Sequence, residues 1–289
     1  MGALRVCEGP GTIFDPGAFD SLPSAARYGA TMDGAARPPG LEGYDLHRRV
    51  FDAPHAEVWD AVGPEGRVAL KVPRTPAARA ALAREDALLA RIRVPGVVER
   101  TAGGPDGAWM ATRWVSGEHA DAWAARQTVD AVVGLAADLA GVLSSLHEKG
   151  VVHGDVKPSN IVVSDGRPVL LDLGMATPSG SCFSGTPGYA APEQLGGMPP
   201  TPASDVYALG VTLFVMLAGD GHPFSADACA QALVPSQRLP WVPGMLRPDI
   251  PTGVDGLFFS LLHPRSSVRP SAAAAEARGA AAAASMARA

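Results

Sequence analysis

The sequence of 289 residues has few cysteines, no long apolar run and no excess of basic residues. Its three cysteines, Cys7, Cys182 and Cys229, are odd in number, far apart and without CxxC spacing. Disulfide frameworks need paired cysteines and zinc sites need closely spaced ligands. The sequence therefore argues against both kinds of site and favours a reducing compartment.

Signals for membrane insertion and secretion are also missing. No uninterrupted apolar run reaches the roughly 18–20 residues that a membrane-spanning helix needs. The N-terminus lacks a basic region followed by an apolar core, which argues against a secretory signal. We therefore expect a cytoplasmic protein without a membrane anchor.

The charge balance offers no electrostatic basis for nucleic-acid binding. Lysine and arginine total 24 residues against 29 aspartates and glutamates, for a net charge of −5, whereas nucleic-acid-binding domains usually carry a basic patch. The hydrophobic content of 47% indicates a folded protein. A chain of this length fits one two-lobed domain or two small domains.

Residues 1–40 differ in composition from the rest of the chain. They are rich in Gly, Pro, Ala and Asp without helical or strand periodicity, which predicts a mostly disordered N-terminal extension. Docking of this segment on the folded domain is the alternative. A further hypothesis is that residues 1–31 are an over-extended gene start, because Met32 shortly precedes the first strand-like pattern. Detection of peptides from residues 1–31 by mass spectrometry would exclude it.

The chemistry is concentrated in two short stretches, HGDVKPSN at residues 153–160 and DLG at residues 172–174. Asp155 could accept a hydroxyl proton, and Lys157 could neutralise charge that builds on a transferred phosphate. Asn160 and Asp172 supply the hard oxygen ligands that Mg²⁺ prefers. Together these groups predict a site for phosphoryl transfer.

These stretches resemble the catalytic loop and metal-binding turn of eukaryotic-type (Hanks-type) bacterial serine/threonine protein kinases. The resemblance implies an α+β, two-lobed protein-kinase-like fold, with a small antiparallel β N-lobe carrying one helix and a larger, mainly α-helical C-lobe. It places the kinase domain at residues 41–276, with the N-lobe at about 41–115 and the C-lobe at about 116–276. An Ala-rich tail at residues 277–289 follows, in which the last helix is expected to fray, with an interruption at Gly279.

The resemblance also implies an activity and its cofactors. The γ-phosphoryl group of ATP would pass to Ser or Thr hydroxyls of protein substrates, with Mg²⁺ or alternatively Mn²⁺. Asp155 would be the catalytic base, assisted by Lys157 and by Thr186, which would bridge the two. Asn160 and Asp172 would ligate the metal ion. Transient homodimers for autophosphorylation are a further expectation.

The N-lobe is expected to open with three strands, at residues 44–50, 57–62 and 67–72. The last of them contains Val-Ala-Leu-Lys, which matches the V-A-I-K strand whose lysine, here Lys71, reaches the α- and β-phosphates. Apolar residues recur at helical spacing in residues 77–93. Glu85 on this helix is placed to pair with Lys71, the alternative being a solvated surface glutamate. A turn at residues 103–107 predicts a hairpin leading to the last strand and the hinge.

Six residues are assigned by the resemblance to the nucleotide pocket: Val58, Ala69, Thr112, Arg113, Val115 and Val162. Thr112 falls at the gatekeeper position. Arg113 replaces the usual acidic hinge residue, which matters little because the hinge recognises adenine through backbone groups. Val58 and Ala69 would lie above the adenine and Val162 below it.

Downstream motifs are typical of protein kinases. Residues 128–148 predict a long buried helix, and residues 184–193 resemble the end of an activation segment with its A-P-E motif. Asp205 is expected to accept hydrogen bonds from the catalytic-loop backbone. Arg269 is expected to form a buried ion pair with Glu193.

The phosphate-covering loop departs from the family pattern. Phe51, Ala53 and Ala56 stand where the family has glycines, whose backbone N–H groups approach the phosphates. Pro54 has no N–H at all. A weaker phosphate clamp follows, and a pseudokinase acting as a scaffold or nucleotide sensor is the alternative function. The complete set of catalytic residues favours an active enzyme.

A second departure is Gly154, where regulated protein kinases have an arginine that receives an activation-segment phosphate. Its absence predicts that activity does not depend strictly on loop phosphorylation. The HGD form also occurs in small-molecule phosphotransferases that share the fold, which is the other enzyme alternative. The motifs around Glu193, Asp205 and Arg269 belong to protein kinases and argue against it.

Overall fold

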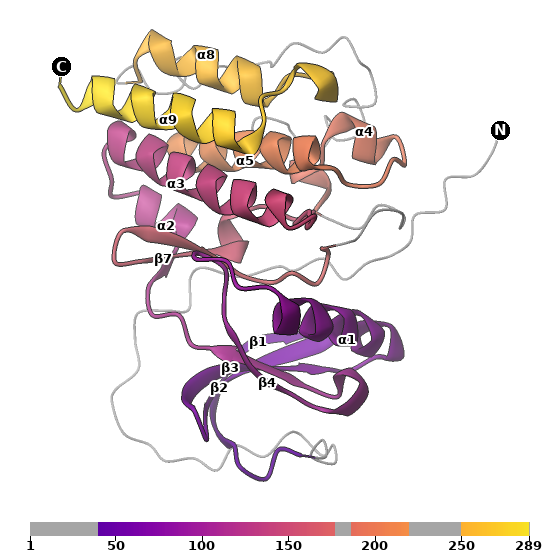
Figure 1. Cartoon of the computed structure of the whole chain (residues 1–289). Helices are drawn as coiled ribbons and strands as arrows, with labels where there is room; N and C mark the ends of the chain where they lie inside the picture. Colours follow the sequence, from indigo (N-terminus) through magenta and orange to yellow (C-terminus); the bar gives the residue numbers. More distant parts are fainter. Residues whose placement is uncertain (1–39, 177–185, 220–249, 289) are drawn as a thin grey trace.

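The structure is a computed structural model that describes residues 40–176, 186–219 and 250–288. In these residues two lobes lie one above the other, a sheet-based N-lobe and a helical C-lobe (Figure 1). The two-lobed α+β fold expected from the sequence is confirmed. The extension predicted for residues 1–40 lies, apart from residue 40, outside the described residues.

The N-lobe is built on a five-stranded antiparallel sheet in the order β1-β2-β3-β5-β4. Its strands are β1 (Asp45–Ala53), β2 (Ala56–Gly63), β3 (Gly66–Pro73), β4 (Arg100–Gly103) and β5 (Met110–Arg113). Helix α1 (Pro76–Arg91) connects β3 to β4 and lies beside the sheet (Figure 1). The 3₁₀ turn η2 (Pro105–Gly107) closes the predicted β4–β5 hairpin.

Helix α1 begins where the sequence supplies the groups that start a helix. Thr75 Oγ1 accepts a hydrogen bond from Ala78 N at 3.2 Å, and Pro76 occupies the first turn, where no backbone N–H is needed. The buried face of the helix consists of Leu82, Glu85, Leu88 and Leu89. Glu85 therefore faces the sheet, as its helical spacing predicts.

The C-lobe consists mainly of helices, with a small sheet of order β6-β7-β8 at its boundary with the N-lobe. The helices are α2 (Ala120–Ala124), α3 (Val129–Glu148), α4 (Pro192–Leu195), α5 (Pro202–Ala218), α8 (Thr252–Leu261) and α9 (Ala272–Met286). The strands are β6 (Glu118–His119), β7 (Ile161–Ser164) and β8 (Arg167–Leu170), and the 3₁₀ turns are η3 (Pro158–Asn160), η4 (Pro187–Tyr189) and η5 (Ser266–Val268).

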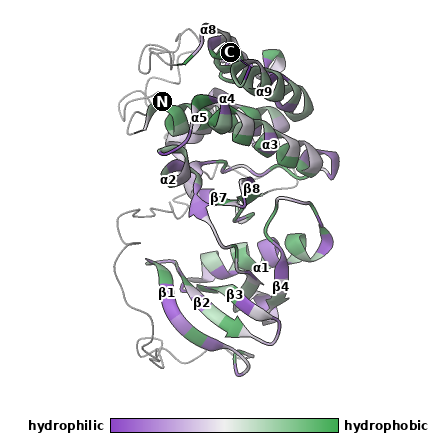
Figure 2. Cartoon of the chain, turned by 90° about the vertical axis from the view of Figure 1, so that its left-hand side faces the viewer, coloured by the Kyte–Doolittle hydropathy of each residue, from purple (hydrophilic) through white to green (hydrophobic). Residues whose placement is uncertain are grey.

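Two apolar cores stabilise the fold. The larger core centres on α3 and α5, contains fully buried side chains such as Leu143 and Phe214, and extends to Leu89 on α1. The smaller core packs on the N-lobe sheet around Trp59 and Trp109. Figure 2 shows the apolar residues gathered on α3 and α5, whereas β1 is largely hydrophilic. Because α1 shares the larger core, it is packed as part of the boundary between the lobes.

Helix α3 is the one described helix that is long and apolar enough to cross a membrane. Its residues line the C-lobe core, and 61% of its most apolar window is buried inside the protein. A buried core helix passes the same test of length and composition. The finding is therefore weak support for a membrane span, and the helix predicted for residues 128–148 is the core helix that was expected.

Helix α9 corrects the prediction for the C-terminal tail. It runs without interruption through Gly279, and the boundary expected after residue 276 falls inside it. Gly279 is buried, and a Cβ at this position would lie 3.0 Å from the Cβ of Ala137 on α3. The missing side chain lets the two helices approach closely, so packing outweighs the low helix propensity of glycine.

Candidate active site

Lys71 on β3 joins α1 to the turn after β8. Its Nζ lies 2.9 Å from Glu85 Oε2 and 3.0 Å from Asp172 Oδ1. The pairing of Lys71 with Glu85 predicted from the sequence is present. Glu85 is only 3% exposed, so the alternative of a solvated surface glutamate is wrong.

Burial and opposite charge shift the pKa values of Lys71, Glu85 and Asp172 in opposite directions. Burial would lower the pKa of Lys71, but the carboxylates of Asp172 and Glu85 outweigh it and raise that pKa above its usual value. Burial would raise the pKa of Asp172, but Lys71 and the Gly174 N–H lower it to about 2. Burial outweighs Lys71 at Glu85 and raises its pKa to about 7. Lys71 and Asp172 are therefore charged at neutral pH.

The turn that carries Asp172 has an uncommon backbone conformation. Asp172 has a φ of +53°, in the left-handed region that non-glycine residues rarely adopt. Gly174 N donates a hydrogen bond to Asp172 Oδ1 at 2.9 Å. Such strain persists where the surrounding structure holds it, and here the bonds to Lys71 and Gly174 hold the carboxylate in place.

Asp155 lies at the centre of a buried network in the loop before β7. Its Oδ1 accepts a hydrogen bond from Thr186 N at 2.9 Å, and its Oδ2 accepts one from Asn160 Nδ2 at 3.0 Å. Lys157 Nζ lies 2.8 Å from Asp155 Oδ2 and donates to Thr186 Oγ1 at 2.6 Å. The predicted bridge from Thr186 to Asp155 and Lys157 is therefore present, and it ties the loop to the residues before η4.

Asp205 on α5 binds the backbone of this loop. Its Oδ2 accepts a hydrogen bond from His153 N and its Oδ1 accepts one from Gly154 N, both at 2.8 Å. These are the backbone contacts predicted from the sequence. His147 Nε2 also lies 2.9 Å from Asp205 Oδ2, a contact that was not predicted. The carboxylate thus fixes the backbone immediately before Asp155.

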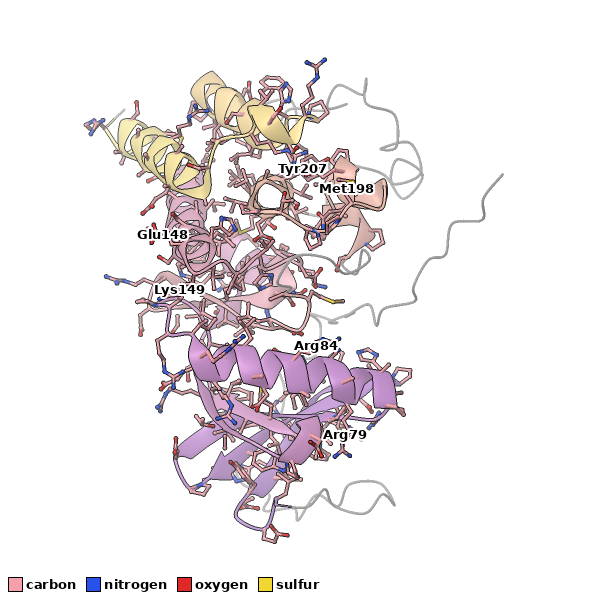
Figure 3. All side chains as sticks on the ribbon, turned by 45° about the vertical axis from the view of Figure 1, so that its right-hand side comes forward. Arg79, Arg84, Glu148, Lys149, Met198 and Tyr207 are labelled. Carbon is pink, nitrogen blue, oxygen red and sulfur yellow. The ribbon has the colours of Figure 1, made fainter. Side chains whose placement is uncertain are left out.

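Arg269 forms the predicted buried ion pair with Glu193. Its Nη1 and Nη2 lie 2.6 and 2.8 Å from the two carboxylate oxygens. The guanidinium also donates to the carbonyls of Ala203, His263 and Pro264 at 2.9, 2.7 and 3.1 Å. It lies 4.9 Å from the ring of Tyr207, which Figure 3 labels within the C-lobe. One side chain therefore joins α4, α5 and the segment before α9.

The predicted adenine residues come from both lobes. In the N-lobe sheet Val58 is paired with Lys71 and Ala69 with Thr112, while Val162 lies on β7 in the C-lobe. Figure 1 shows β3 and β7 on the two sides of the boundary between the lobes.

The two predicted hinge residues, Arg113 and Val115, differ in exposure. Arg113 is exposed, its Nε lies 2.8 Å from Glu99 Oε2, and its backbone N donates to Glu99 O at 2.8 Å. Val115 is half-buried, two residues beyond β5.

A second arginine holds the hinge and was not predicted. Arg67 bonds Asp60 through Nε and Nη2, at 2.9 and 2.8 Å, and its guanidinium lies 4.2 Å from the ring centre of Trp114. Trp114 N also donates to Arg67 O at 3.1 Å. The sequence offers one local indication of this contact, an aspartate and an arginine on adjoining strands of a hairpin. The aromatic partner, Trp114, follows β5 and lies far along the chain from both.

Asn160 and Asp172 are the residues that could hold a cation. Asn160 Nδ2 donates to Asp155 O at 2.8 Å as well as to its carboxylate, which leaves the amide oxygen for a ligand. No group of three or more His, Cys, Asp or Glu side chains suited to a metal ion occurs among the described residues. One carboxylate and one amide suit Mg²⁺, which is commonly bound by one or two carboxylates together with substrate phosphates and water.

Comparison with known proteins identifies a family. The family model of the protein kinase domain matches residues 65–278, which is more than half of the chain. The chain is similar to the serine/threonine-protein kinase PknK of Mycobacterium tuberculosis, with 49% identity over 88 residues, or 28% of this chain and 8% of the relative. It is 35% identical over 146 residues to the probable serine/threonine-protein kinase PkwA of Thermomonospora curvata, covering 48% of this chain and 19% of the relative. It is 34% identical over 158 residues to the serine/threonine-protein kinase PknJ of Mycobacterium tuberculosis, covering 50% of this chain and 26% of the relative.

These matches span about a quarter or less of the length of each relative. The domain match, in contrast, includes the lysine of β3, the loop around Asp155, the turn at Asp172 and the buried pair of Glu193 with Arg269. The chain belongs to the protein kinase domain family.

Proposed function

We propose that the chain is an ATP-dependent serine/threonine protein kinase. The observation that carries the proposal is the joined set of contacts from Glu85 through Lys71 to Asp172, together with the network of Asp155, Lys157 and Thr186. Kinases need the lysine–glutamate pair and the metal-binding aspartate in place at the same time. The geometry is therefore the one that a catalytically competent kinase would have.

Each group has a separate task in the proposed reaction. Asp155 accepts the proton of the substrate hydroxyl, or orients that hydroxyl for attack. Lys157 lies within hydrogen-bond distance of both Asp155 and Thr186, and its ammonium stabilises charge on the transferred phosphoryl group. Lys71 holds the α- and β-phosphates.

Asn160 and Asp172 would hold Mg²⁺, which protein kinases generally use with ATP, and the ion would neutralise charge on the β- and γ-phosphates. The lowered pKa of Asp172 keeps this carboxylate ionised at neutral pH. Mn²⁺ is a suitable substitute. Protein substrates with Ser or Thr hydroxyls, and transient pairing of two copies for autophosphorylation, follow from the same proposal.

A pseudokinase is the second candidate, favoured by one observation. Phe51, Ala53 and Ala56 replace the glycines of the phosphate-covering loop, and β1 and β2 stay paired up to Ala53 and Ala56. Fewer backbone N–H groups are then free to turn toward phosphates. The protein would bind a nucleotide without transferring its phosphoryl group.

One experiment separates these functions. Purified protein is incubated with labelled ATP, Mg²⁺ and a generic basic protein, and Asp155→Asn serves as the matched control. Incorporation into protein that the variant loses supports the kinase. An absence of incorporation, combined with a rise in melting temperature on addition of ATP, supports the pseudokinase. Transfer to small molecules but not to protein would contradict both.

A further inference from the structure

The hairpin of β1 and β2 has two faces with different side chains. Phe51 is paired directly with Val58, and Val58 is paired with Lys71 on β3. Residues directly opposite each other on neighbouring strands point to the same face of a sheet. Phe51 and Val58 therefore lie on the face from which Lys71 reaches Asp172.

His55 in the turn of this hairpin belongs to the same face. Its ring centre lies 6.3 Å from the ring centre of Phe51. Burial lowers the pKa of His55, the charge of Lys71 lowers it further, and Asp172 acts in the opposite direction. The imidazole thus lies within electrostatic range of both charged groups, and it is neutral at physiological pH with one N–H to donate.

The opposite face of the hairpin is held by charged side chains. Asp52 is paired with Glu57, and the guanidinium of Arg74 bonds to both, with Nη2 2.7 Å from Glu57 Oε2. Arg74 also donates to Ala53 O at 3.0 Å, and its backbone N donates to His55 O at 2.7 Å. Both sides of the turn are thus tied to the end of β3.

A turn held in this way differs from a glycine-rich loop. Glycines allow the backbone to move and to present its own N–H groups to phosphates. Here Pro54 has no N–H to offer, and Arg74 fixes the backbone of the turn. The turn therefore offers fewer backbone donors than a glycine-rich loop, and His55 is the polar side chain that it presents to the Lys71 face.

We propose that His55 is a phosphate-binding residue that donates a hydrogen bond from its imidazole to the β-phosphate of the nucleotide. This inference rests on the proposed use of ATP, and it assigns to one side chain the task that the glycine backbone performs in the family. Arg74 is the positioning residue that holds the turn over the site.

The test measures nucleotide binding, which is independent of phosphoryl transfer. Calorimetry compares the affinities of ADP with Mg²⁺ and of adenosine for the wild type, His55→Ala, His55→Gln and His47→Ala. His47 is the matched control, since it lies on β1, is about half exposed and pairs with Asp45. We expect His55→Ala to bind ADP at least about tenfold more weakly, because hydrogen bonds to charged groups contribute strongly. Adenosine affinity should stay unchanged, His55→Gln should keep most of the ADP affinity, and His47→Ala should match the wild type.

Other outcomes overturn the inference. Unchanged or tighter ADP binding by His55→Ala would show that the ring gives no phosphate contact or obstructs the site. Equal weakening of ADP and adenosine would show a structural role only, and a wild type that binds no ADP would also refute it. A wild type that binds ADP through His55 but transfers no phosphoryl group would refute the proposed kinase activity and leave this inference standing.

Discussion

Replacement of Arg269 by alanine is expected to lower the free energy of unfolding by about 3–5 kcal/mol, the usual cost of breaking a buried ion pair. The Arg269 side chain is 0% exposed and Glu193 is 18% exposed. The change would leave the Glu193 carboxylate and three backbone carbonyls without the donor that now binds them. Those unpaired groups are the physical source of the loss.

The chain offers a matched control of the same chemistry. Arg113 and Glu99 form an ion pair with 2.8 Å between their nearest atoms, but their side chains are 55% and 47% exposed. Exposed pairs contribute about 0–1 kcal/mol, since water solvates both charges after either partner is removed. Arg113→Ala should therefore change the free energy of unfolding by no more than about 1 kcal/mol.

Urea denaturation of the two variants and the wild type gives these free energies by linear extrapolation. Arg269→Lys should recover only part of the loss, because an ammonium cannot reproduce the bidentate geometry of the guanidinium. A loss of unfolding free energy in Arg269→Ala no larger than that in Arg113→Ala would contradict this prediction. Wild-type stability of Arg269→Lys would contradict it as well.

Three other predictions concern packing, ionisation and regulation. Gly279→Val should lower the free energy of unfolding by about 1–3 kcal/mol, because a Cβ there would press on Ala137 of α3. Valine at the exposed position Ala280 is the control. Equal denaturation midpoints for the two variants would contradict the prediction. Burial raises the pKa of Tyr189 to about 12, with Asp121 and Asp155 adding to the effect. Because the folded pKa exceeds the unfolded value of 10.0, the stability from this group is complete below pH 10 and is lost between about pH 10 and 12. Tyr189→Phe should reduce this alkaline loss of stability in melting curves recorded across that pH range. An unchanged dependence of melting temperature on pH would contradict the prediction. Activity should survive phosphatase treatment, because Gly154 stands where a phosphate-receiving arginine would be and Asp155 is already held by Thr186; complete loss of activity in the treated enzyme would refute this.

The local sequence pattern was sufficient to predict the placement of residues whose position depends only on their own helix or strand. The helical spacing of residues 77–93 places Glu85 on the buried face of α1, and the Val-Ala-Leu-Lys pattern places Lys71 on strand β3. These features were predicted correctly because helix and strand periods fix which side chains share a face.

Contacts between distant elements could be predicted only where family motifs named both partners. The pairs Glu193–Arg269 and Lys157–Thr186 were named in this way and are present. The bonds from Arg74 to Asp52 and Glu57 were not predicted, because no local spacing joins β1, β2 and the end of β3. The continuity of α9 through Gly279 was missed for a related reason, since glycine lowers helix propensity in isolation and only packing on α3 reverses its effect.

Motifs in the sequence were enough to predict a two-lobed kinase domain in which Phe51, Ala53 and Ala56 replace the glycines of the family's phosphate-covering loop. Residue types and their spacing carry that information, because each motif is local. The contacts that hold the hairpin of β1 and β2, and the place of His55 in it, follow from the three-dimensional arrangement. Asp52 and Glu57 bind Arg74 on one face of the hairpin, and His55 lies near Phe51 on the other face. Strand pairing and turn geometry bring these residues together, although no helical or strand period in the sequence relates them.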